Sequence, residues 1–257
     1  QNPNSRRFPL MKGLTEISPK SLKGEKQMEY SVPFKWAICA ASVSLLLAIQ
    51  GNCMAEETNV LELDKNLSSY EWKEREQAAE SIAQLGKAAK ITIPSLIERL
   101  KDEEWQVRKA AANALGSMGT EAKTAVSPLI GALGDEEWHV REPAAYALAA
   151  IGPASVPAVT ALIKALHDEE WRVRKPAALA LEAIGLASKP ALPFLIELLD
   201  DAEWQVRKAG IQALGTLGPS AREAIPALEK KLSDDENQVQ IEAVKALNKI
   251  KMNRREK

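Results

Sequence analysis

The chain has 257 residues, of which 34 are Lys or Arg and 35 are Asp or Glu, so its formal net charge is −1. With 46% hydrophobic and 27% charged residues it has the composition of an ordinary folded protein, which excludes a disordered chain and an integral membrane bundle. The near-neutral charge excludes a broadly basic nucleic-acid-binding protein, and two cysteines, Cys39 and Cys53, are too few for a disulfide-rich scaffold.

The N-terminal part of the chain has the layout of a targeting segment. Residues 1–27 are polar and show no sustained periodicity, and we expect them to be a disordered upstream extension from an over-extended reading frame. After Met28 a lysine precedes an apolar run over 36–49, and small residues stand at the −3 and −1 positions of a cut after Ala55. The run is shorter than the ~20 residues of a spanning helix. We therefore predict a signal peptide over 28–55 and an extracytoplasmic mature protein, periplasmic or secreted, without membrane contact.

Beyond the predicted signal peptide, a period of 33 residues organises the sequence. Fixed self-similarity of this length indicates a repeat array. Each period contains two helical patterns, and in one second helix Val107, Ala111, Ala114, Leu115 and Met118 form an apolar face. A glycine follows, and glycine ends helices because it adopts the left-handed conformation at little cost. The recurring residues are Trp72, Trp105, Trp138, Trp171 and Trp204, and Gly86, Gly119, Gly152, Gly185 and Gly218. The mature domain, 56–257, divides into units at 58–86, 87–119, 120–152, 153–185, 186–218 and 219–251 and a tail at 252–257.

The recurring motifs resemble those of a known repeat family. The pattern D-E-E-W-x-V-R-x-x-A-A-x-A-L occurs at 102–115 and 135–148, and P-x-L-I-x-x-L occurs at 94–100. Together they resemble the HEAT repeat family, specifically the bacterial HEAT-like repeats of the PBS-lyase type. The resemblance covers 58–251 and implies an all-α fold, a right-handed α-solenoid (superhelix) of six two-helix repeats. It also implies that the first helices are convex and the second helices line the concave side. The T-P-L-H-x-A signature of ankyrin repeats, which share the period, is absent.

Two positions of the repeat are charged in five of the six units, and we call each set of equivalent residues a column. The arginine column is interrupted in the last unit and the aspartate column in the first. They consist of Arg75, Arg108, Arg141, Arg174 and Arg207, and of Asp102, Asp135, Asp168, Asp201 and Asp234. Unit six has Gln240 in place of the arginine, and unit one has Ser69 in place of the aspartate. These are the two residues that would lack a partner if each arginine paired with the aspartate of the following unit, so we predict an Arg–Asp ladder in that direction. The tryptophan column ends at Asn237, and we predict that each indole packs against the next unit.

The sequence shows no recognisable catalytic or metal-binding constellation. Some HEAT-like enzymes hold iron with repeated His-Glu pairs, but here His139 precedes Val140 and His167 precedes Asp168. Both cysteines leave with the predicted signal peptide, and acidic runs such as 102–104 are explained as favourable charges before a helix N-terminus. We therefore expect a protein that is not an enzyme and that holds no cofactor and no metal.

Several second-helix positions that point away from the apolar face vary between units. Tyr146 and Leu179 stand among charged residues there, which is the composition of an interaction hot spot. We predict a non-enzymatic scaffold that binds a protein partner, and no nucleic acid, on its concave face. Two alternatives stay open: an enzyme or enzyme subunit of HEAT-like type, such as a bilin lyase or hydroxylase, and a carbohydrate-binding protein that uses the tryptophans. The predicted partner-binding residues are His139, Glu142, Tyr146, Arg172, Lys175, Leu179, Lys109, Asn113, Lys208 and Gln212.

Overall fold

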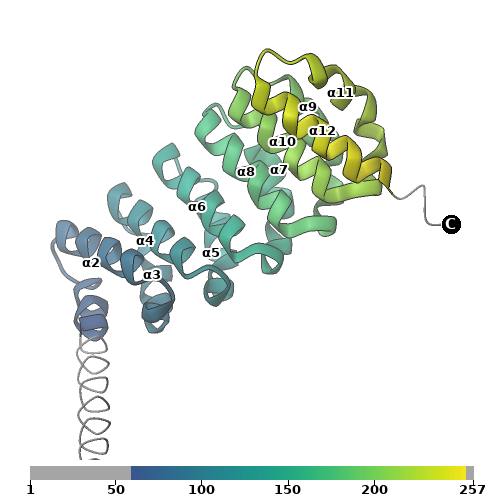
Figure 1. The fold of residues 1–257 in the computed structure, drawn as a ribbon. Coiled ribbons are helices and arrows are strands. Elements are labelled where there is room, and N and C mark those ends of the chain that lie inside the picture. Colours follow the sequence, from purple (N-terminus) through teal and green to yellow (C-terminus); the bar gives the residue numbers. More distant parts are fainter. Residues whose placement is uncertain (1–58, 253–257) are drawn as a thin grey trace, which may run out of the picture. The chain divides into compact units, whose positions relative to one another are not determined.

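The computed structural model describes residues 59–252, and within that range the chain consists of helices joined by short turns, without strands (Figure 1). The predicted extension at 1–27 and the predicted signal peptide at 28–55 lie outside the described residues, as do residues 253–257. The described helices form six two-helix units that stack in chain order into a right-handed α-solenoid, as predicted.

Each unit contains a short helix followed by a long helix, and 3-10 segments connect the units. The short helices are residues 59–66, α3 (Ile93–Arg99), α5 (Val126–Ala132), α7 (Val159–Ala165), α9 (Leu192–Glu197) and α11 (Ile225–Lys230). The long helices are α2 (Trp72–Leu85), α4 (Trp105–Met118), α6 (Trp138–Ile151), α8 (Trp171–Ile184), α10 (Trp204–Leu217) and α12 (Asn237–Lys251). The connecting segments are η1 (Gly86–Thr92), η2 (Gly119–Ala125), η3 (Gly152–Ala158), η4 (Gly185–Ala191) and η6 (Gly218–Ala224), and η5 (Leu198–Asp200) and η7 (Lys231–Ser233) extend α9 and α11.

The ends of the long helices are set by residues that recur in five of the six units. Before α6, the carboxylate of Asp135 accepts a hydrogen bond from the backbone N–H of Glu137 at 3.0 Å, which holds the acidic loop in a tight turn. The aspartates of the other ladder units make the same contact. At the far end of α4, Gly119 has a φ of 57°, a conformation that only glycine adopts readily. The five glycines predicted to stop the helices are confirmed in that role.

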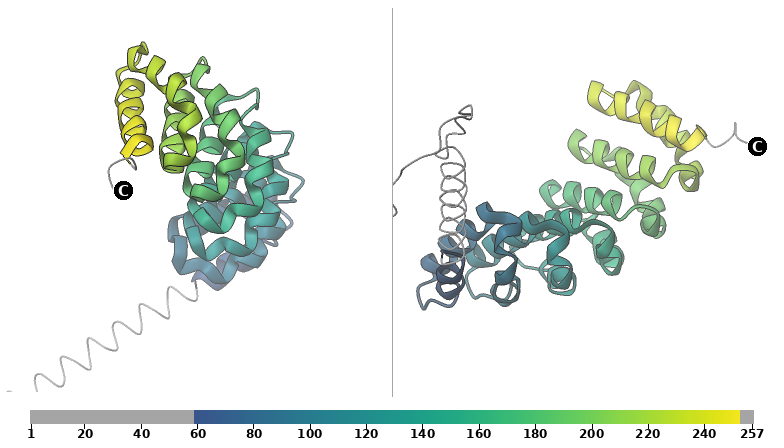
Figure 2. Two further views of the ribbon diagram at one scale, coloured as in Figure 1. Left: turned by 90° about the vertical axis from the view of Figure 1, so that its right-hand side faces the viewer. Right: turned by 60° about the horizontal axis from the view of Figure 1, so that its bottom comes forward.

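The long helices form the inner layer of the curved array. Consecutive long helices pack directly on one another, whereas consecutive short helices make few contacts with each other. This difference in spacing curves the array toward the long helices, so they line the concave side and the short helices lie on the convex side (Figure 2). Small residues permit the close approach, because a Cβ added to Gly116 of α4 would lie 3.2 Å from the Cα of Ala147 in α6.

The hydrophobic core is a continuous layer between the long and the short helices. The five residues predicted to form the apolar face of α4, from Val107 to Met118, are all buried. Two stretches, Trp138–Ala165 and Trp171–Asp200, are long and apolar enough to cross a membrane by length and composition alone. In this array each consists of a long helix and a short helix with the adjoining 3-10 segments, and their buried apolar side chains belong to the core.

The Arg–Asp ladder runs in the predicted direction. Arg141 of unit three donates from Nε and Nη2 to the two carboxylate oxygens of Asp168 in unit four, at 2.7 and 2.9 Å. The four other pairs repeat this bidentate geometry. The Nη1 of Arg141 donates to the backbone carbonyls of Asp135 and Glu136, both at 2.9 Å. Each arginine therefore joins the loop of its own unit to the loop of the next, and its engaged donors are not available to bind a row of anions.

Candidate binding surface

A row of indoles marks the start of the long helices, and basic side chains lie over these indoles. The guanidinium of Arg172 lies 5.2 Å from the ring centroid of Trp138 and 5.0 Å from that of Trp171. The imidazole of His139 stacks on Trp138, with 3.7 Å between ring centroids, and its centroid is 4.8 Å from that of Trp105. His139 and Arg172 thus each contact the indole of their own unit and the indole of the preceding unit. The predicted packing of Trp105 and Trp138 against the next unit is confirmed.

Two lysines extend this row toward the N-terminal units. The Nζ of Lys73 lies 5.6 Å from the ring centroid of Trp72, and the Nζ of Lys109 lies 6.0 Å from that of Trp105. A cation in this position is attracted by the negative face of the ring. The indoles of the first four units therefore each have a basic group over a face. A sugar ring would have to displace a basic group in order to stack on any of these covered faces, which argues against the carbohydrate-binding alternative.

The residues predicted to bind a partner lie on α4, α6, α8 and α10, and we call the side of these four helices that bears them the concave face. Tyr146 of α6 is 38% exposed, and Lys109, Asn113 and Arg172 are also exposed. Leu179 of α8 is half-buried and packs against the hydrophobic core, so it is part of the interior as well as of the surface. The remaining predicted residues, all partly exposed, are His139, Glu142, Lys175, Lys208 and Gln212.

Basic groups from three helices surround Glu142 on the concave face. Burial raises the pKa of Glu142 above its ordinary value, while the nearby basic side chains, chiefly Arg172, Lys109 and Lys175 and to the least extent His139, act in the opposite direction. These groups come from α4, α6 and α8, so the structure brings five of the predicted residues within electrostatic reach of one another. The result is a cluster in which one carboxylate is outnumbered by cations.

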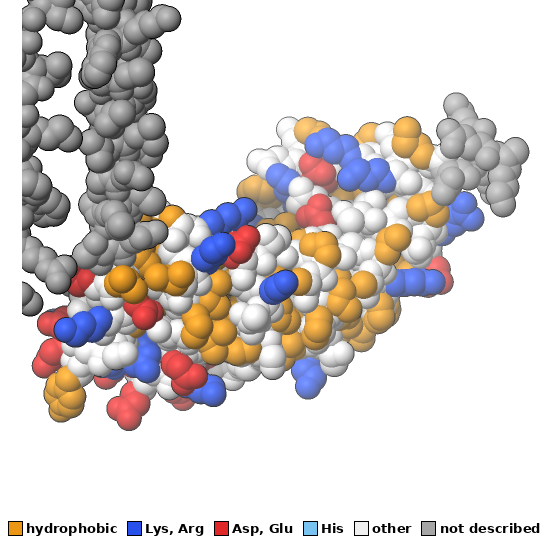
Figure 3. All heavy atoms as spheres, turned by 90° about the horizontal axis from the view of Figure 1, so that it is seen from below, with side chains coloured by type: hydrophobic (Ala, Val, Ile, Leu, Met, Phe, Trp, Pro, Cys, Tyr) orange, Lys and Arg blue, Asp and Glu red, His pale blue; other side chains and the backbone are white. Residues whose placement is uncertain are grey.

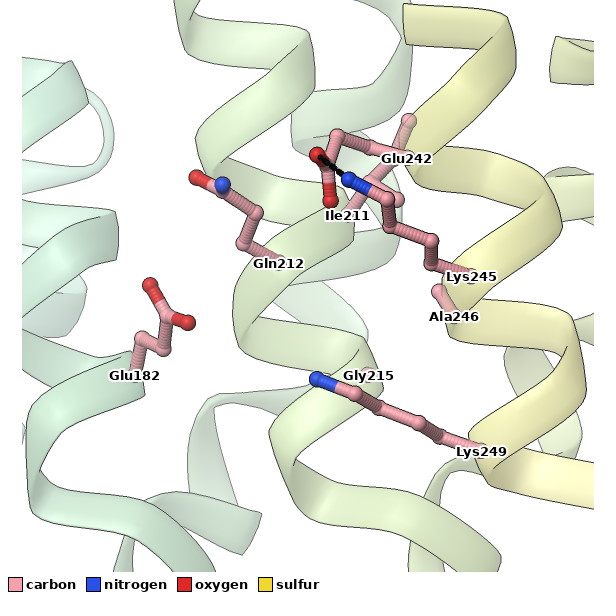
Figure 4. A pocket seen from close by; sticks show the side chains of 8 residues that line it. All are labelled: Glu182, Ile211, Gln212, Gly215, Glu242, Lys245, Ala246 and Lys249. Carbon is pink, nitrogen blue, oxygen red and sulfur yellow. Dashed lines mark hydrogen bonds and ion pairs between the residues drawn. The ribbon is translucent and has the colours of Figure 1, made fainter.

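The concave surface is hollowed further along the array, between α8, α10 and α12 (Figure 4). The hollow has a volume of about 260 Å³ and includes Gly215 in its lining, where the lack of a side chain leaves space between the helices. Glu182 of α8 and Lys249 of α12 extend toward it from opposite sides. Burial raises the pKa of Glu182, and the charge of Lys249 and the hydroxyl of Thr216 partly offset this rise.

Sequence reasoning selected only Gln212 among the residues that line this hollow. A signal was present, because Glu182 is the one charged residue in its column of the repeat. The other members of that column are Ala83, Gly116, Ala149, Gly215 and Asn248. Lys208, another predicted residue, lies nearby on α10 and donates a hydrogen bond to Gln238 of α12 at 2.8 Å.

A second surface with exposed apolar residues lies on the 3-10 segments. Ile91 of η1, Val156 of η3 and Leu186 of η4 are all exposed. Figure 3 views the array from below, where the long helices end and these segments follow, and shows hydrophobic side chains gathered over much of that side. No segment within residues 59–252 covers these three side chains.

The two histidines lie in different surroundings. His139 packs between indoles, whereas the ring of His167 meets Phe194 edge-on at 5.7 Å and its Nε2 lies 3.4 Å from Glu197. Within residues 59–252, no three His, Cys, Asp or Glu side chains are grouped so that they could hold a metal ion.

The stacked two-helix units and the Arg–Asp ladder define an α-solenoid repeat protein. The pattern of the HEAT repeats matches residues 62–126, 93–182, 126–215 and 192–256, so the matches together extend over all six units. The chain therefore belongs to the HEAT repeat family.

Solved structures of similar fold include natural and designed solenoids. An engineered protein has 28% sequence identity and a TM-score of 0.65 over 75% of this chain and 96% of its own. A designed armadillo repeat protein in complex with the peptide (KR)4 has 26% identity and a TM-score of 0.65 over 74% of this chain and 98% of its own. A chain from the complex of CpcE and CpcF of phycocyanin lyase from Nostoc sp. PCC7120 has 30% identity and a TM-score of 0.56, over 62% of this chain and 65% of its own. No curated protein matches the sequence.

Proposed function

We propose that this protein is a non-enzymatic scaffold that binds a protein partner on its concave face. The observation that carries the proposal is that exposed residues of this face differ between units while the columns beneath them repeat. The arginine, tryptophan and alanine columns each keep one residue type in five of the six units, because stacking requires it. The exposed positions are free of that requirement and can differ for recognition, and solenoids offer such extended curved surfaces for binding.

The centre of the concave face has the composition of a protein interface. Tyr146 presents an aromatic ring that is 38% exposed, and Arg172 and Lys175 lie on the neighbouring helix. Aromatic residues and arginine are enriched at the energetic centres of interfaces. The designed armadillo repeat protein of similar fold was solved with a bound peptide, which supports the same use of a solenoid surface here.

Site-specific cross-linking tests which face binds the partner. A photo-reactive amino acid is placed at Asn113, which is exposed on α4, and in a second variant at Thr160, which is exposed on α7 of the convex side. We expect one partner to be cross-linked from position 113 and not from position 160. Cross-linking from position 160 alone would place the partner on the convex side and contradict the proposal.

Two tyrosines allow a matched measurement of the binding energy. Tyr146→Ala should weaken binding of the cross-linked partner by roughly 1–4 kcal/mol. Tyr70→Ala removes the same side chain from the loop before α2, where it is 97% exposed, and should leave binding unchanged. Leu179 is less suitable for truncation because it also packs against the core. Unchanged binding of the Tyr146→Ala protein would exclude this residue as the anchor.

A second candidate function is that of a subunit in a bilin lyase complex, and it is favoured by the likeness to the phycocyanin lyase chain. A bilin added to the purified protein distinguishes the two candidates. The scaffold proposal expects the absorbance spectrum of the bilin to be unchanged. A spectral shift that saturates at one bilin per chain would favour the lyase-subunit candidate.

We further propose that the mature protein acts outside the cytoplasm. The support is the apolar run over 36–49 followed by small residues up to Ala55. N-terminal sequencing of protein made in a bacterial host should begin at Glu56. A cytosolic product that retains Met28 would contradict export.

A further inference from the structure

We propose that the concave face selects an acidic, extended segment of its protein partner, an inference that rests on the proposed function of this face. The concave face bears three columns of equivalent long-helix residues, which in unit two begin with Gln106, Lys109 and Asn113. In units two to five these columns contain four permanent cations and a single carboxylate, that of Glu142. The cations are Lys109, Arg172, Lys175 and Lys208. The whole chain has a formal net charge of −1. The positive charge of these columns is therefore concentrated on the concave face and is not a property of the whole surface.

Three of the four cations are already held by neighbouring groups. Arg172 contacts two indoles, at 5.2 and 5.0 Å from their centroids, and Lys109 lies 6.0 Å from the centroid of Trp105. Lys208 is held by its hydrogen bond to Gln238. Long basic side chains normally lose conformational freedom when they bind an anion. Side chains that are held beforehand lose less, so these cations are prepared to bind carboxylates.

The surroundings of Glu142 indicate where the positive field converges. The permanent cations Lys109 of α4 and Arg172 and Lys175 of α8 act on this carboxylate, and no Lys or Arg nitrogen lies within salt-bridge distance of it among the described residues. The positive charge around Glu142 is therefore not neutralised by a salt bridge to this carboxylate. A partner carboxylate that approaches between Lys109 and Lys175 would meet this uncompensated charge.

The acidic loops limit the shape of the partner. The loops before the long helices carry the exposed carboxylates Glu103, Glu136 and Glu169 at one edge of the array. A broad acidic surface would meet these like charges, whereas an extended segment that follows the columns across successive helices would contact the cations and avoid the loops. Tyr146 lies within the same columns and offers an apolar contact to such a segment.

Two labelled peptides and the full chain test the inference by fluorescence anisotropy. One peptide alternates Glu with Leu, and the other replaces each Glu by Lys. We expect the acidic peptide to bind more tightly, and its affinity to fall as salt is added because exposed charges are screened.

Two neighbouring residues of opposite charge provide a matched pair of variants. Lys175→Gln removes a positive charge and should weaken binding of the acidic peptide by about two- to fivefold, whereas Glu142→Gln removes a negative charge and should strengthen it by about two- to fivefold. Lys189→Gln removes a positive charge from the exposed surface of η4 and should leave binding unchanged.

The outcomes separate this inference from the proposed function. Opposite effects at positions 175 and 142 support the inference. Tighter binding of the basic peptide, weakened by Tyr146→Ala, would overturn the inference and leave the proposed function standing. A different outcome is binding of the acidic peptide that is weakened by Lys189→Gln and unaffected by Lys175→Gln and Tyr146→Ala. That result would place the peptide on the 3-10 segments and overturn both the inference and the proposed function. No binding of the acidic peptide at millimolar concentration would overturn the inference alone.

Discussion

The two residues that interrupt the Arg–Asp ladder keep the contacts within their own units. The Oγ of Ser69 accepts a hydrogen bond from the backbone N–H of Glu71 at 3.2 Å, which is the turn contact that the aspartates make elsewhere. The Nε2 of Gln240 donates to the backbone carbonyl of Asp234 at 2.6 Å, as the Nη1 of each arginine does in its own unit. Only the bond to an adjacent unit is missing at each end. The bidentate pair is therefore the part of the motif that stacking requires.

Exchanging arginine and glutamine tests whether the bidentate bond between units, rather than the bonds within a unit, stabilises the array. Arg141→Gln should lower the free energy of unfolding by about 3 kcal/mol, because it leaves the largely buried Asp168 without its bidentate partner. Gln240→Arg should change that free energy by less than about 0.5 kcal/mol, because no aspartate follows it in the sequence. Urea denaturation followed by circular dichroism measures both. Equal effects of the two substitutions would contradict the ladder as an inter-unit stabiliser.

Glu182 should make the stability depend on pH. Burial raises its pKa, so the folded state binds more protons than the unfolded state between the ordinary and the raised value, and stability falls as pH rises through that window. Glu182→Gln should therefore stabilise the protein at neutral pH, by less than about 1 kcal/mol because Lys249 offsets part of the cost. Below about pH 4 both states carry the proton and the substitution should have little effect.

Urea denaturation at neutral and at acidic pH measures this difference, with Glu223→Gln on the exposed surface of η6 as the control. Stabilisation by Glu182→Gln that persists at acidic pH would show that the buried charge is not its cause.

Among the elements, the long helices depend on small residues for their spacing. One column of these helices contains only alanine and serine: Ser81, Ala114, Ala147, Ala180, Ala213 and Ala246. Opposite this column, a Cβ added to Gly116 or Gly215 would lie 3.2 or 3.3 Å from a backbone Cα of the next helix. The curvature of the concave face therefore follows from how closely these helices can approach.

Two glycines should respond in opposite ways to a larger side chain. Gly116→Val should lower the free energy of unfolding by about 1–3 kcal/mol, because the added methyl groups press against the backbone of α6 at Ala147. Gly131→Ala, in the last turn of α5 with no atom within 4 Å of the new Cβ, should raise it by up to about 0.5 kcal/mol through helix propensity. Thermal and urea denaturation measure both, and a Gly116→Val protein of native stability would contradict the close packing.

For the whole molecule, every unit makes equivalent bonds to its neighbours. The stability of such an array is approximately a sum over units and the interfaces between them. Removal of unit four, residues 153–185, would place Arg141 opposite Asp201 and keep the tryptophan column in register. We therefore expect this shortened protein to fold with unchanged helicity per residue and a lower unfolding midpoint.

A deletion out of phase with the repeat serves as the control. Removal of residues 153–180 leaves a similar chain length but places mismatched columns opposite each other, so cooperative unfolding should be lost. Circular dichroism during thermal denaturation distinguishes the two proteins. Similar cooperativity in both would show that the columns do not set the stacking register.

The sequence by itself determined the fold class and the direction of the ladder. Its six units sample each position of the repeat several times, so columns required by stacking stand out from columns that vary, and the exceptions Ser69 and Gln240 fall at the ends of the array. Helix periodicity likewise assigned the buried face of α4 correctly, because burial of that face depends mainly on spacing within one helix.

Only the tertiary structure decided how side chains of different units meet. Contacts of His139 and Arg172 with two indoles each, the packing of Leu179 on the core, and the hollow beside Gly215 all depend on the distance between neighbouring long helices. That distance is set jointly by small residues on both helices of a pair. Residues 30 or more positions apart therefore meet in ways that the repeat pattern of a single unit does not specify.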